Sequence, residues 1–183
     1  MKRLLLGLMV AALAAIEFGG VGGLAANNAT LQTFGTAVAT GPASATMNND
    51  NAPYYGGVYI QSKSQSGKLI GDASFSFVSN GDVCCGAPRF SIPINTSGPS
   101  GGAGSVAGYA FIDAANCGGS SNVSTTVSTT EAGCKVFFDT ISGYDNWGAF
   151  AAAHPTYRIA QGHFPFIIAD EPGHYAVSSI VLT

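Results

Sequence analysis

The sequence predicts an all-β fold: a β-sandwich of jelly-roll or immunoglobulin-like type with one short helix near residues 144–154. Between residues 57 and 182, short apolar runs rich in aromatic and β-branched side chains recur between turn signals. Such runs are typical of half-buried strands, and many of them at this spacing favour a sandwich or barrel. A clear helical spacing of apolar residues appears around Trp147, which accounts for the single helix.

The first 26 residues have the pattern of a secretory signal peptide. Lys2 and Arg3 precede an apolar core over residues 4–16, and small residues follow up to Ala26. Glu17 ends the apolar run before the ~18 residues that a membrane-spanning helix needs. We therefore expect export and cleavage, which would leave a secreted or cell-surface protein without a membrane span. The alternative is a retained anchor.

Residues 27–53 are low in complexity and offer few large apolar side chains. Such a composition does not offset the entropy of ordering the chain. We expect a flexible lead-in here, with a short first strand around Leu31, Phe34 and Val38 as the alternative. Residues 54–183 then form a single β-sandwich domain.

The charge of the chain excludes nucleic acids and anionic lipid surfaces as partners. The chain has 7 Lys and Arg against 10 Asp and Glu, and Lys2 and Arg3 belong to the predicted signal. Nucleic-acid binding requires clustered basic residues that displace counterions from phosphates, and anionic lipid attracts polybasic segments. The mature chain has no such cluster, and its polar residues are mainly Ser, Thr, Asn and Gly.

The four cysteines all follow the predicted signal, so they would meet an oxidising compartment. We favour a disulfide between Cys117 and Cys134, which closes a loop of Gly, Ser, Thr and Asn between strands at 109–113 and 135–141. Cys84 and Cys85 would then form a vicinal disulfide, stay reduced, or each pair with a cysteine of the loop. Because C-x-x-C spacing is absent, structural bridges are favoured over a metal site.

Three further strands are expected before that loop. Residues 57–61 and 73–78 are the first two, and Asn80-Gly81 then marks a hairpin turn. Residues 89–94 alternate with Pro93 on the face away from the apolar one. Since proline cannot donate to a ladder, we expect this strand at a sheet edge or with a bulge.

The helix and a final hairpin complete the chain. Ser142 begins a sequence like a capping box, the helix buries Trp147 and Phe150, and His154 caps its end before Pro155. Two strands follow at 164–169 and 174–182. Between them Pro172 and Gly173 fit a type II turn, which predicts a C-terminal hairpin.

No catalytic or metal-binding constellation is predicted, and no cofactor. A G-x-S-x-G elbow is absent. The predicted hairpin separates His163 from Glu171 and His174, so one ion cannot bind them together. Asp113 and Asp139 end the two central strands, which leaves a glycosidase-like carboxylate pair or a Ca²⁺ site as alternatives.

Aromatic residues give the better candidates for binding. Tyrosine and tryptophan combine an apolar face with a polar tip, as sugar and protein surfaces require. The candidate ligand-binding residues are Tyr54, Tyr55, Tyr109, Asp113 and Trp147.

The leading hypothesis is a secreted, non-enzymatic binding module for carbohydrate, cell-wall polymer or another cell-envelope component. One alternative is an assembly subunit of a cell-surface layer, joined through strand edges. The other is a secreted hydrolase that uses carboxylates such as Asp113 and Asp139. Oligomeric state is left open.

Overall fold

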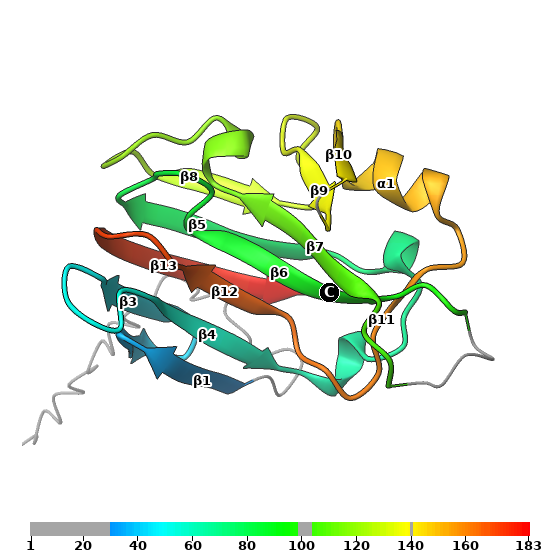
Figure 1. Ribbon diagram of the computed structural model, residues 1–183, viewed down its shortest axis with the longest axis horizontal. Coiled ribbons are helices and arrows are strands. Elements are labelled where there is room, and N and C mark those ends of the chain that lie inside the picture. The colour runs from blue at the N-terminus through cyan, green and yellow to red at the C-terminus, as the bar shows by residue number, and fades with distance from the viewer. Residues whose placement is uncertain (1–29, 99–103, 140) are drawn as a thin grey trace, which may run out of the picture.

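Two antiparallel sheets pack face to face in the computed structural model, which describes residues 30–98, 104–139 and 141–183 (Figure 1). The predicted all-β sandwich is therefore confirmed. Within the described residues, sheet A has eight strands and sheet B has five. The predicted signal peptide lies outside these residues.

Sheet A runs, in spatial order, β1 (Thr30–Gly35), β4 (Gly56–Gln61), β12 (Phe166–Ala169), β6 (Arg89–Asn95), β7 (Gly108–Asp113), β9 (Val136–Phe138) and β10 (Ile141–Tyr144), with β11 (Arg158–Ile159) also pairing β6. Sheet B runs β2 (Ala37–Gly41), β3 (Ser44–Asn48), β13 (His174–Leu182), β5 (Phe75–Gly81) and β8 (Thr125–Ser128).

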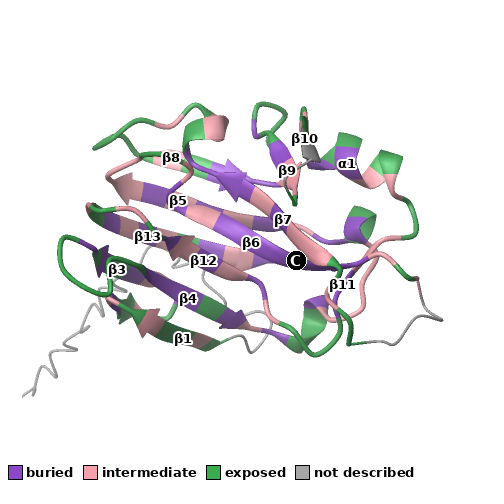
Figure 2. Ribbon diagram, in the orientation of Figure 1, coloured by how far each residue is buried: buried purple, intermediate pink, exposed green. Residues whose placement is uncertain are grey.

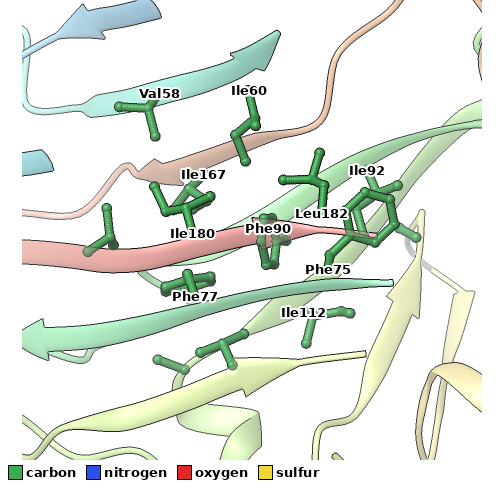
Figure 3. Packing of buried hydrophobic residues seen from close by; sticks show 14 of the residues in the cluster. Val58, Ile60, Phe75, Phe77, Phe90, Ile92, Ile112, Ile167, Ile180 and Leu182 are labelled. Carbon is green, nitrogen blue, oxygen red and sulfur yellow. The ribbon is translucent and has the colours of Figure 1, made fainter. Parts of the chain in front are cut away.

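The core lies between the sheets and follows strand alternation. Phe75 and Phe77 of β5 point toward Phe90 of β6, and the rings of Phe77 and Phe90 meet edge to face at 4.9 Å (Figure 3). Ile112 and Ile167 are fully buried beside them. Burying each such side chain contributes about 1.5–3 kcal/mol relative to leaving it exposed.

The N-terminal segment differs from the expected flexible lead-in. The chain forms β1 at the edge of sheet A, turns at Gly35 and Thr36, and continues as β2 at the edge of sheet B. β3 then pairs both β2 and β13. The composition of this segment suggested that it was too polar to fold. It is ordered by backbone hydrogen bonds between the strands and by buried side chains such as Ala45 and Met47.

The predicted C-terminal hairpin is wrong. β12 pairs β4 and β6 in sheet A, whereas β13 pairs β3 and β5 in sheet B. The turn at 170–173 therefore carries the chain from one sheet to the other. The fully buried side chain of Asn49 donates hydrogen bonds to the carbonyls of Ala169 (2.9 Å) and Glu171 (3.1 Å), which fixes this crossing.

The predicted hairpin turn at Asn80-Gly81 and the predicted edge position of the strand with Pro93 are also wrong. Asn80 and Gly81 do not form a hairpin turn, because both lie within β5 and pair with Ala176 and Tyr175 of β13. The strand that contains Pro93 is central, between β12 and β7. Along one edge of β6, the pairing with β12 ends at Ser91 and the pairing with β11 starts at Ile94. Proline is tolerated at position 93 because it lies between these two partner strands.

β7 and β9 pair as predicted, and Cys117 and Cys134 form the disulfide at the base of the loop between them. The loop is more ordered than its composition suggested, since it contains β8, which pairs β5 in sheet B. Cys84 and Cys85 are bonded to each other. The Cys117–Cys134 disulfide thus closes an excursion from sheet A to sheet B and back.

The helix α1 (Trp147–Ala153) buries Trp147 and Phe150, as its spacing predicts. Its N-cap is Asn146, whose side chain accepts a hydrogen bond from the backbone N–H of Ala149. This places the start of the helix beyond the predicted capping box. His154 is the C-cap. Among the described residues no helix is long and apolar enough to cross a membrane.

Candidate functional site

The outer face of sheet A carries a band of aromatic side chains. Because side chains alternate along a strand, the buried Ala110 and Ile112 of β7 place Tyr109 and Phe111 on the face away from the core. The same alternation puts Tyr59 of β4 and Phe166 of β12 outward. In Figure 2, intermediate residues alternate with buried ones along β12, and an exposed residue interrupts the buried ones along β4. We define the aromatic band as Phe34, Tyr55, Tyr59, Tyr109, Phe111 and Phe166.

Strand register aligns the middle of this band across the sheet. Tyr59 lies opposite Phe166, Phe166 lies opposite Ser91, and Ser91 lies opposite Phe111. Residues that are directly opposite in an antiparallel pair share one face and have Cβ atoms about 4.5–5.5 Å apart. The row therefore crosses β4, β12, β6 and β7 in sequence.

The rings of the band contact one another continuously. Phe34 lies with its ring centroid 6.4 Å from that of Tyr55 and 4.8 Å from that of Tyr59. Tyr59 is 5.4 Å from Phe166, and Phe166 is 5.7 Å from Tyr109. Tyr109 then stacks on Phe111 at 6.4 Å. Such offset and edge-on pairs stabilise each other by about 0.5–1.5 kcal/mol beyond burial.

Two small residues make this continuity possible. At Gly57 an added Cβ would lie 2.3 Å from Cζ of Phe34, so the phenyl ring extends over β4 where a side chain would otherwise stand. On β6, Ser91 is 1 % exposed and its hydroxyl has no hydrogen-bond partner among the described residues. Phe166 and Tyr109 come from the strands on either side of β6, and their rings meet across it because Ser91 is small.

One ion pair borders the band. Arg89 donates two hydrogen bonds of 2.6 Å to the carboxylate of Asp170. Its guanidinium lies 5.5 Å from the ring centroid of Phe111 and also donates to the carbonyl of Gly86. This cation–π contact joins the ion pair to the band, and the paired charges cancel.

Polar side chains border the band at β1 and β4. Gln32 lies opposite Tyr59, and its side chain accepts a hydrogen bond from Gln61. Thr30 donates to the side-chain oxygen of Gln61 at 3.3 Å. The outer face thus combines aromatic rings with uncharged amide and hydroxyl groups.

The structure brings together only part of the predicted site. Tyr55 and Tyr109 belong to the band, and Tyr54 is 55 % exposed in the adjoining turn. Asp113 is buried, and its carboxylate accepts hydrogen bonds from the backbone and side chain of Asn116. Trp147 is buried in the core, where its indole N–H donates to the carbonyl of Ile70. Asp113 and Trp147 therefore do not belong to the aromatic band.

The candidate residues predicted from the sequence omit Phe34, Tyr59, Phe111 and Phe166. For Phe111 and Phe166 the sequence contains a signal. All of residues 109–112 and 166–169 are apolar or aromatic, so both faces of each strand are apolar. A strand with one solvated face instead alternates apolar with polar residues. A strand with both faces apolar indicates that its second face is also covered or used.

The two candidate carboxylates do not converge. Asp113 ends β7, whereas the carboxylate of Asp139 lies against Gly108 at the start of the same strand. Five residues of strand separate these positions by about 17 Å. Paired carboxyl groups of glycoside hydrolases lie about 5–9.5 Å apart, so this pair does not have the geometry of a glycosidase.

Two other titratable groups, His174 and Tyr175, have hydrogen-bond partners. His174 pairs with Asp50 at 2.6 Å, and within the described residues no group of three His, Cys, Asp or Glu side chains could bind a metal. Burial, with Asp82, Glu171 and Asp170 nearby, raises the pKa of Tyr175, whose hydroxyl donates to the carbonyl of Pro172.

Comparison with known proteins adds no relative to this description. No protein-family model matches the chain, and no curated protein matches it in sequence.

Proposed function

We propose that the protein is a secreted, non-enzymatic module that binds uncharged polysaccharide through the aromatic band. The observation that supports this proposal is the continuous, partly exposed row of rings on the outer face of sheet A. Tyr55 is 43 % exposed and Tyr59 is 38 % exposed, so both rings can lie against a ligand. Aromatic faces with polar tips suit the mixed apolar and hydroxyl surface of a sugar ring.

Charge favours an uncharged polymer over an acidic one. Arg89 is neutralised by Asp170, and the amide and hydroxyl groups of Gln32, Gln61 and Thr30 border the band. An acidic polysaccharide would need unpaired basic side chains to offset its desolvation. The predicted signal peptide agrees with a ligand outside the cell.

The test is a pull-down of the purified protein with insoluble cellulose, xylan and chitin, compared with polygalacturonate as an acidic polymer. We expect saturable binding to at least one uncharged polymer. Tyr59→Ala should abolish it, because Tyr59 contacts both Phe34 and Phe166. Val38→Ser is the matched control, since Val38 is 62 % exposed and belongs to β2 of sheet B.

The same band also supports a second candidate, an assembly subunit, because aromatic residues are enriched at protein interfaces. In that case no polysaccharide binds. The wild-type protein then sediments as a multimer at micromolar concentration, and Tyr59→Ala dissociates it. That pair of results would replace carbohydrate recognition with self-association.

A further inference from the structure

The aromatic band has its long axis oblique to the strands. Its contacts cross from β1 through β4, β12 and β6 to β7. On β4 it is narrow, because the outward neighbours of Tyr59 are Gly57 and Gln61. Phe34 and Tyr55 lie toward the start of β4 from the paired row of Tyr59, Phe166 and Phe111, whereas Tyr109 lies on the opposite side of that row. A ligand that uses all of the rings must therefore cross the strands obliquely.

The length of the band exceeds one sugar ring. Four strand spacings separate β1 from β7, and at about 4.8 Å each they amount to about 19 Å. At the β1 end, the exposed Tyr55 lies beside the edge strand of the sheet. A polymer chain can continue over this edge, so the band suits an internal stretch of a chain.

We propose that the band binds one extended, uncharged polysaccharide chain that runs obliquely across the strands, from Tyr55 beside β1 to Tyr109 on β7. Successive sugar rings stack on Tyr55, Tyr59 and Tyr109. This inference rests on the proposed function, and it specifies the direction of the ligand and the minimum length of ligand that fills the site.

The experiment is calorimetric titration of the full protein with β-1,4-linked glucose, xylose and N-acetylglucosamine oligosaccharides, from disaccharide to hexasaccharide. We expect affinity to increase with chain length until the ligand spans the band. Tyr55→Ala and Tyr109→Ala remove opposite ends of the band. Each should weaken hexasaccharide binding by about 3- to 10-fold while changing disaccharide binding less.

Tyr55→Phe and Tyr109→Phe are the controls for folding, since each keeps the ring and its packing and should retain binding that depends on length. Affinity that depends on Tyr59 but is equal for disaccharide and hexasaccharide would overturn the cross-strand chain and leave the proposed function intact. If no oligosaccharide and no polymer binds, the proposed function fails and the inference fails with it.

Discussion

At the scale of single residues, the binding face depends on side chains that are small. Gly57 and Ser91 contribute almost nothing to the band themselves, but they leave the space in which Phe34, Phe166 and Tyr109 meet. The buried Ser91 hydroxyl, which has no partner in the described part of the chain, carries a desolvation cost of about 1–3 kcal/mol. The position thus combines a small volume with a destabilising polar group.

Gly57→Ala tests the role of this space. The new Cβ would lie 2.3 Å from Cζ of Phe34 and 2.4 Å from the carbonyl oxygen of Ile167. We expect a loss of about 1–3 kcal/mol in the free energy of unfolding, typical of overpacking, together with weaker polysaccharide binding. Urea denaturation measures the first effect. Gly133→Ala is the control, because no described atom lies within 4 Å of the point where its Cβ would stand; an equal loss there would contradict the explanation.

At the scale of elements, the residues of a turn do not determine which sheet the next strand joins. The turn at 170–173 has the residues of a hairpin turn, yet it links β12 of sheet A to β13 of sheet B. Packed sheets lie about 10 Å apart, a distance that the same few residues can span. Asn49 decides between the two outcomes, since it is buried and binds the chain on both sides of Asp170.

Asn49→Ala is expected to destabilise the protein by about 1–3 kcal/mol, because it leaves buried backbone carbonyls without donors. Thermal or urea unfolding followed by circular dichroism measures the change. Asn48→Ala is a matched control at the neighbouring position, where the side chain is exposed. We expect it to change stability by less than about 0.5 kcal/mol. Similar losses in the two variants would show that Asn49 does not anchor the crossing.

At the scale of the whole molecule, the two disulfides have different effects on the unfolded chain. Cys117 and Cys134 are 17 residues apart, whereas Cys84 and Cys85 are adjacent. Only the former closes a loop of appreciable length, and that loop includes β8 of the opposite sheet. Chain entropy therefore favours the Cys117–Cys134 bridge as the stabilising one.

The double variant Cys117→Ala/Cys134→Ala should lose about 3 kcal/mol of unfolding free energy, as expected for a closed loop of this size. Cys84→Ala/Cys85→Ala should lose much less, since its bridge closes almost no loop. Guanidinium denaturation of both variants under oxidising conditions gives the comparison. A greater loss from the adjacent pair would contradict the entropic explanation.

Local chemistry in the sequence determined the fold class, the pairing of β7 with β9, the inward face of α1 and the Cys117–Cys134 bridge. Each of these features depends on side-chain periodicity or on residues that are close together in the sequence. The predicted strand over residues 135–141 is shorter than expected, because Ile141 begins β10, which pairs with β9. Trp147 illustrates the limit, because its helical spacing predicted burial while its aromatic character suggested a ligand. The structure places it in the core.

Only the tertiary structure decided which sheet each strand joins and which aromatic residues meet. A period of two separates the two faces of a strand, but it does not say which face meets the core or which strands become neighbours. Phe34, Tyr59, Phe166 and Tyr109 are far apart in sequence and come together through the order β1–β4–β12–β6–β7. That order is set by non-local hydrogen bonding and core packing, and the candidate binding face exists only as its result.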